Sequence, residues 1–142
     1  MKLDVYLNYN GNCQEAFRFY EQHLGGKVIL MMTHGQGPNA ANLSADQKNT
    51  ILHARVMIGN TVLMGADIPK SEPMRSAYVA LTLDSEMEAE RVYELLSKDG
   101  QIFMKMEKSF SLIDLQCFEI NLARLGCSFT RYRWHLMRRN WM

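Results

Sequence analysis

Residues 11–26, "GNCQEAFRFYEQHLGG", predict a helix whose two ends are both marked in the sequence. Asn12 is a favourable N-cap residue, and Glu15, three positions later, completes a capping-box pattern. Gly25 and Gly26 end the helix, because glycine adopts the left-handed C-cap conformation at little cost. The helix is amphipathic, and its predicted apolar face consists of Ala16, Phe19, Tyr20 and Leu24.

Strand patterns lie on both sides of this helix. The segment "LDVYLNY" (3–9) alternates with period two, and "KVILMMTH" (27–34) is rich in apolar residues. The segment "ILHARVMIGNTVLMGAD" (51–67) is typical of a hairpin, with two alternating runs around Gly59 and Asn60. Residues 35–49 are rich in Gly, Pro and Asn, so we expect a long loop there that covers a site.

The same order of elements begins again after residue 75. Residues 76–84 predict a strand, 85–100 ("SEMEAERVYELLSKDG") a helix with Ser85 and Glu88 as a second capping box, and 101–107 a strand. The helix caps, the Tyr-Glu pairs and the glycine stops of the two helices correspond at shifts of 73, 73 and 74 residues. We interpret this match as an internal duplication rather than as two unrelated α/β units.

The duplication predicts an α+β fold of paired βαβββ modules within one domain. The modules comprise residues 1–67 and 76–142, with a linker at 68–75. A chain of 142 residues is long enough for one domain and short for two. The second module then requires a final hairpin equivalent to 51–67, near residues 125–141.

The bulk composition excludes several classes of protein. Hydrophobic residues make up 47% and charged residues 22% of the chain, as in ordinary soluble domains. We find neither a run long enough to span a membrane nor a secretory signal at the start. The three cysteines form an odd set without a disulfide pattern, so we expect a reducing cytoplasm.

The end of the chain differs from the rest in charge. Residues 1–110 carry a balance of −2 and residues 111–142 a balance of +3, and the last 17 residues, "GCSFTRYRWHLMRRNWM" (126–142), contain no acid. One nucleotide lost near the codons for residues 105–111 would explain this change. Read out of frame from Ile113-Asp114 onward, the codons permit "RFAMFRDKFGTSWMLIHE", which has the pattern of a hairpin.

We therefore interpret residues 108–142 as a frameshifted form of the final hairpin, so that this hairpin is missing or altered. We place no functional residue after Met106. The alternative is a natural basic tail, whose arginines could bind phosphates.

Three segments resemble the PhnB-like branch of the vicinal-oxygen-chelate superfamily, which includes glyoxalase I, extradiol dioxygenases and bleomycin-resistance proteins. They are "YLNYNGNCQEAFRFYEQHLGGKV", "ILHARVMIGNTVLMGAD" and "GQIFM". The resemblance covers residues 1–107 and implies paired βαβββ modules around a pocket, in a homodimer. Members of this branch are often labelled as a demethylubiquinone methyltransferase. The chain lacks the glycine-rich loop after a first strand that such chemistry would need.

Metal-dependent members of this superfamily bind a divalent ion through His and Glu side chains on the first and fourth strands of each module. Here the corresponding strands offer Tyr6 and Asn8, then Met64, with Asp67 on the other face. Divalent metals need two or three converging imidazole or carboxylate ligands. We find no such set, so we expect no metal and no other cofactor.

The remaining pocket candidates lie on the 51–67 hairpin. His53 shares a strand face with Arg55, and it is either a pocket acid or base or a hydrogen-bonded structural histidine. Asp67 orients His53 or a ligand, or else caps the following turn. Cys13 lies in the first turn of a helix, where a thiol pKa can fall, but without a visible histidine partner we expect it to be structural.

The sequence therefore predicts a PhnB-like, metal-independent protein that binds a small organic ligand. We expect a cytoplasmic homodimer that binds neither nucleic acid nor membranes. The alternative is a metal-dependent lyase or dioxygenase of the glyoxalase type, and the sequence leaves open whether the protein is an enzyme.

Overall fold

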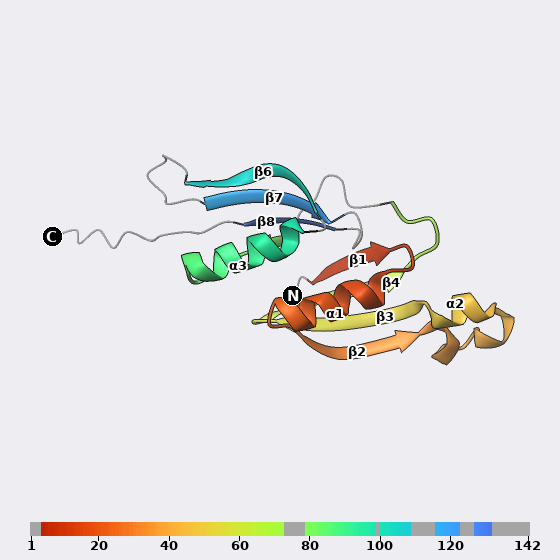
Figure 1. The fold of residues 1–142 in the computed structure, drawn as a ribbon. Coiled ribbons are helices and arrows are strands. Elements are labelled where there is room, and N and C mark those ends of the chain that lie inside the picture. Colours follow the sequence, from red (N-terminus) through yellow and green to blue (C-terminus); the bar gives the residue numbers. More distant parts are fainter. Residues whose placement is uncertain (1–3, 73–78, 99, 109–115, 123–126, 132–142) are drawn as a thin grey trace. The chain divides into compact units, whose positions relative to one another are not determined.

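The computed structural model describes residues 4–72, 79–98, 100–108, 116–122 and 127–131, which form two compact units (Figure 1). The first unit contains β1 (Val5–Tyr9), α1 (Cys13–His23), β2 (Lys27–Thr33), β3 (Ile51–Ile58) and β4 (Thr61–Asp67). The second contains β5 (Val79–Leu81), α3 (Glu86–Ser97), β6 (Gln101–Lys108), β7 (Gln116–Leu122) and β8 (Cys127–Arg131). The predicted α+β architecture of paired βαβββ modules is confirmed.

The two units have the same sheet topology. The strand orders are β1-β4-β3-β2 and β5-β8-β7-β6. In each sheet the first strand pairs in parallel with the last strand, and the other neighbours are antiparallel. A shared order that includes one parallel pair is what a duplicated βαβββ module predicts.

Helix α1 packs on one face of the first sheet and forms the core there. The ring of Phe17 contacts that of Tyr9 edge to face, and the hydroxyls of Tyr9 and Tyr20 lie 3.0 Å apart. The buried face of α1 differs from the prediction, because Phe19 and Leu24 are only partly buried. Four residues at helical spacing form it instead: Cys13, Ala16, Phe17 and Tyr20.

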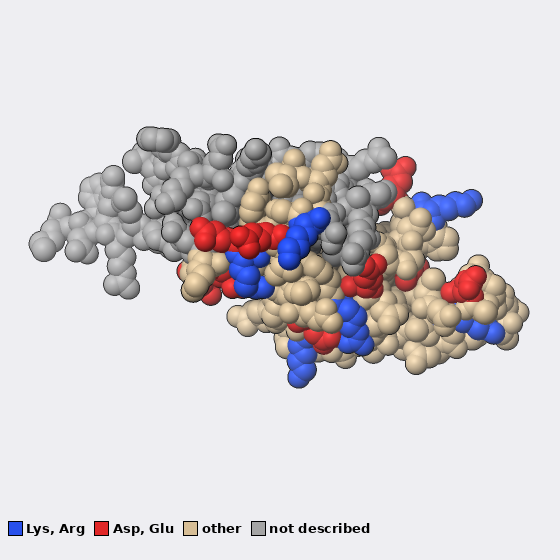
Figure 2. All heavy atoms as spheres, viewed as in Figure 1, with Lys and Arg blue, Asp and Glu red and all other residues tan. Residues whose placement is uncertain are grey.

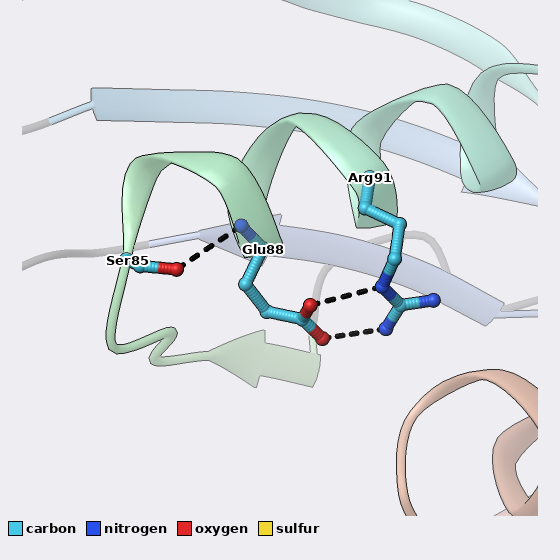
Figure 3. A network of polar contacts seen from close by, with 3 residues as sticks. All are labelled: Ser85, Glu88 and Arg91. Atoms are coloured by element: carbon cyan, nitrogen blue, oxygen red, sulfur yellow. Dashed lines mark hydrogen bonds and ion pairs between the residues drawn. The ribbon is translucent and has the colours of Figure 1, made fainter.

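The two helices begin with different caps, and the predicted capping box of α1 is wrong. Asn12 makes no side-chain cap hydrogen bond, because a carboxylate from β4 satisfies the helix start. In α3 the Ser85 hydroxyl does accept the Glu88 N–H, at 3.1 Å (Figure 3). The Glu88 carboxylate turns toward Arg91, one helical turn on, and accepts two of its hydrogen bonds, at 2.9 and 2.5 Å.

The segment predicted as a long loop is partly helical. It contains two 3-10 turns, His34–Gln36 and Ala40–Asn42, followed by the short helix α2 (Ala45–Asn49). A capping box between Ser44 and Gln47 starts α2. Gly, Pro and Asn lie at the breaks between these short elements, and their frequency led to the prediction of a continuous loop.

The final hairpin begins earlier in the sequence than the duplication predicted. Strands β7 and β8 pair with each other, and β8 also pairs with β5. The connection from β6 to β7 is shorter than the one from β2 to β3, so the hairpin falls at 116–131 rather than near 125–141. The second sheet therefore contains a final hairpin, so of the two expected outcomes, missing or altered, the first is wrong.

The frameshift remains a hypothesis about the gene. Resequencing of codons 100–142 tests it, and an intact frame would contradict it. Residues 132–142 of the basic tail lie outside the described part of the chain.

Two further observations concern membranes and anionic partners. Among the described residues, no helix is both long and apolar enough to cross a membrane. On the face shown in Figure 2, basic and acidic side chains lie beside one another, and the described residues gather into no basic patch there.

Candidate functional site

The strand register divides the first sheet into two faces, because directly paired residues point to the same side. Tyr6 pairs with Met64, Met64 with Arg55, and Arg55 with Leu30. These residues lie opposite to α1, on what we call the open face of the sheet. Two further rows of paired residues extend this face. On one side of the first row, Asn8 pairs with Ala66 and His53 with Met32; on the other side, Met57 pairs with both Lys27 and Val62.

Five of the six predicted pocket residues lie on the open face, and the structure brings two of them into contact. The Tyr6 hydroxyl lies 3.1 Å from Nδ1 of His53, and the two rings are stacked with centroids 5.6 Å apart. His53 is thus hydrogen-bonded across the sheet. This geometry fits the structural alternative for His53 and still leaves its Nε2 available for a ligand.

Arg55 occupies the middle of the open face, where none of the described residues gives it a polar partner. Its direct neighbours on the adjoining strands are Leu30 and Met64, both apolar. Its Nε atom is buried and has no hydrogen-bond partner among the described residues. A buried N–H that makes no hydrogen bond costs about 1–3 kcal/mol, so this donor would gain from an acceptor brought by a ligand.

Large apolar side chains surround Arg55 and stay accessible. They are Tyr6, Leu30, Met32 and Met57, exposed by 46%, 38%, 36% and 40%. Methionine adapts its shape to what it contacts, so this surface suits an apolar ligand. Apolar side chains exposed together in this way mark binding surfaces more often than chance placement does.

The sequence did not identify Leu30 as a member of this surface. A β-bulge between Val28 and Leu30 shifts the strand by one residue. Strict alternation from Lys27 would have placed Met31 on the open face, but the bulge places Leu30 and Met32 there instead. Neither Gly nor Pro stands at this position, so the sequence carries no local signal for the bulge.

Asp67, the sixth predicted residue, lies on the opposite face and is 4% exposed. Its Oδ1 accepts hydrogen bonds from the N–H groups of Gly11 (2.9 Å) and Cys13 (3.0 Å). Its Oδ2 accepts one from Ile51 N–H, at 2.7 Å. Asp67 therefore caps α1 and anchors the start of β3. The sequence had suggested that it orients His53 or caps the following turn, and among the described residues it does neither.

Among the residues considered for the site, Cys13 and Tyr6 have pKa values that are raised by their surroundings. Burial raises the pKa of the Cys13 thiol, and the nearby Asp67 carboxylate raises it further. The free thiol of Cys13 is 0% exposed, which agrees with the structural role predicted for it. Desolvation also raises the pKa of Tyr6, so its phenol stays a neutral hydrogen-bonding group at physiological pH.

The donors on the open face do not fit a divalent metal ion. Within β1–β4 the face offers one imidazole, one phenol and one amide, but no carboxylate. The guanidinium of Arg55 would repel a cation at its centre. Among the described residues, no group of three His, Cys, Asp or Glu side chains lies close enough to hold a metal.

Comparison with known proteins identifies relatives of this chain. The family model of the glyoxalase/bleomycin resistance protein/dioxygenase superfamily matches residues 2–110. Protein YjdN of Escherichia coli (strain K12) is 30% identical over 121 residues, covering 78% of this chain and 82% of YjdN.

Two solved structures have the same fold. Protein PA1353 from Pseudomonas aeruginosa is similar with a TM-score of 0.76 and 32% identity, covering 94% of this chain and 98% of that one. A putative 3-demethylubiquinone-9 3-methyltransferase, PhnB protein, from Bacillus cereus has a TM-score of 0.73 and 19% identity, covering 94% and 99%. At that identity the second likeness shows the fold alone.

Proposed function

Because the chain belongs to the glyoxalase/bleomycin resistance protein/dioxygenase superfamily, we propose that it binds a small organic molecule on the open face of its first sheet, without a metal ion. The observation that carries this proposal is the exposure of four large apolar side chains on one sheet face. One of the four, Tyr6, is hydrogen-bonded to His53, and the group lies around the buried Nε of Arg55, which has no hydrogen-bond partner in the described part of the chain. A polar centre within an apolar rim is the usual composition of a small-molecule site.

The donor chemistry supports binding without a metal. A metal-dependent lyase or dioxygenase would need imidazole and carboxylate ligands that converge. Within β1–β4 the open face has one imidazole, His53, and the one carboxylate of these strands, Asp67, lies on the other side and accepts hydrogen bonds from three backbone N–H groups. A ligand held by polar and apolar contacts is the simpler use of these side chains.

The test is a binding screen read at the proposed surface. A library of small organic molecules is added to the ¹⁵N- and methyl-labelled protein, and shifts are mapped by NMR. We expect the hits to perturb Leu30, Met32, Met57 and Met64 while leaving the exposed face of α1 unchanged. Hits that perturb other regions alone, or no hits from the library, would contradict the proposed site.

Metal dependence is tested separately. The purified protein is incubated with Mn²⁺, Zn²⁺ or Fe²⁺, dialysed, and analysed by inductively coupled plasma mass spectrometry. We expect less than about 0.1 ion per chain. A stoichiometric ion that His53→Ala removes would replace this proposal by the metal-dependent alternative, a glyoxalase-type lyase or dioxygenase.

We further propose that the protein works in the cytoplasm as a homodimer. The buried free thiol of Cys13 and the odd cysteine count support a reducing compartment. Light scattering coupled to size exclusion should give about twice the 16.4 kDa chain mass. A monomer at micromolar concentration would contradict the assembly, and recovery in an extracytoplasmic fraction would contradict the location.

A further inference from the structure

The charges of the first sheet are sorted between its two faces. Within β1–β4 the basic side chains are Lys27, Arg55 and His53, and the register places all three on the open face. The one acidic side chain of these strands, Asp67, lies on the α1 side. The binding surface is therefore lined by strands that contribute positive charge and no negative charge.

Within the described part of the chain, Arg55 differs from the two helical arginines that form ion pairs. Arg18 and Arg91, in the helices, each pair with a glutamate one turn away, at 2.8 and 2.5 Å. Arg55 makes no ion pair or hydrogen bond among the described residues, although its Nε is buried. A guanidinium presents its N–H groups as a planar fork that matches the two oxygens of a carboxylate or the oxygens of a phosphate.

We propose that the natural ligand of this face is a small organic oxyanion with an apolar body, and that Arg55 binds its anionic group. This inference rests on the proposed function and names its ligand class. The apolar body lies on Leu30, Met32, Met57 and Met64. The Tyr6–His53 pair, on the same face, supplies a second polar contact through a ring nitrogen or the phenol.

The surroundings favour this assignment over a neutral ligand. Charge-assisted hydrogen bonds are about twice as strong as hydrogen bonds between neutral groups. Arg55 stands between two apolar neighbours, so water competes less for its N–H groups than at an exposed site. An oxyanion pairs the buried Nε in a bond between two charged groups, whereas a neutral oxygen makes a weaker bond and a hydrocarbon leaves the N–H unpaired.

The experiment compares probes with one ring system and different head groups. The probes are 2-naphthoate, 2-naphthyl phosphate and 2-naphthylmethanol, and their Kd values are measured by titration calorimetry at pH 7 and low salt. We expect at least one of the two anions to bind about tenfold or more tightly than the alcohol. The anion that binds more tightly shows whether the natural head group is a carboxylate or a phosphate.

Two variants locate the effect. Arg55→Gln should abolish the preference for the anion. Arg18→Gln, which removes an equally basic side chain from α1, should keep the preference. Circular dichroism checks that both variants fold. In the wild-type protein, added NaCl should weaken the binding of the two anions and leave the binding of the alcohol unchanged.

The outcomes separate this inference from the proposed function. Equal affinity for all three probes at the open face, or a preference that survives Arg55→Gln or that added NaCl leaves unchanged, overturns the oxyanion assignment while the binding site stands. Failure of all three probes to bind there overturns the proposed site and the oxyanion assignment with it.

Discussion

Replacement of Asp67 by asparagine should destabilise the fold strongly, although the two side chains have nearly the same shape. The carboxylate accepts three backbone hydrogen bonds, two on Oδ1 and one on Oδ2. An asparagine keeps one acceptor oxygen. If that oxygen faces Gly11 and Cys13, its amide N–H₂ group meets the N–H of Ile51, which lies 2.7 Å from Oδ2 in the native protein.

The magnitude follows from counting these contacts. One buried N–H left unpaired costs about 1–3 kcal/mol, and each of the two remaining bonds loses about 1 kcal/mol when its acceptor becomes neutral. The sum is about 3–5 kcal/mol, against a total stability of about 5–15 kcal/mol for a typical domain. We therefore expect the Tm of Asp67→Asn to fall by roughly 10 °C or more.

The assay is urea unfolding at pH 7, followed by far-UV circular dichroism. Asp46→Asn serves as the matched control, because Asp46 is exposed in the first turn of α2. We expect the control to change the free energy of unfolding by less than about 0.5 kcal/mol. If Asp67→Asn behaves like the control, the structural role assigned to Asp67 is refuted. A loss of ligand binding without a loss of stability would restore its predicted pocket role.

Four further outcomes are expected. Arg55→Gln should raise the free energy of unfolding of the unliganded protein by up to about 1 kcal/mol in urea, because it removes a buried unpaired N–H, and a clear loss would reveal a hidden partner. Gly65→Ala should lower the Tm at a cost of about 1–3 kcal/mol, since a Cβ there would lie 3.0 Å from the rings of Phe17 and Tyr9; an unchanged melting curve would argue against this packing. Because burial raises its thiol pKa, Cys13 should resist iodoacetamide between pH 7 and 9 in the folded protein and react in urea, and equal rates by peptide mass spectrometry would contradict burial. Ser85→Ala should cost about 1 kcal/mol and speed hydrogen exchange in the first turn of α3, whereas unchanged exchange would show that the cap contributes little.

Much of the site could be predicted from strand alternation. The period-two pattern places Tyr6 with Asn8, and His53 with Arg55, on common faces, and the structure pairs Tyr6 with Met64 and Met64 with Arg55 as neighbours. It could not predict the contact between Tyr6 and His53, because that contact depends on how β1 and β3 flank β4.

Other features of the site depend on segments that are distant in sequence. The sequence assigned the cap of α1 to Asn12, which is adjacent, but Asp67 makes it from 54 residues away. The bulge between Val28 and Leu30 has no local marker, and it decides which residues of β2 reach the open face. The lack of a partner for Arg55 among the described residues is also a tertiary property, because a partner could have come from any neighbouring strand.

The sequence by itself determined the βαβββ order, its repetition and the superfamily, because strand and helix periodicities and helix ends are written in neighbouring residues. The tertiary structure alone decided the position of the final hairpin, the structural role of Asp67 and the charge sorting that leaves Arg55 without a partner among the described residues. These features depend on register and on contacts between distant segments. Alternation along one strand shows which side chains share a face, and only the assembled sheet shows what those side chains meet.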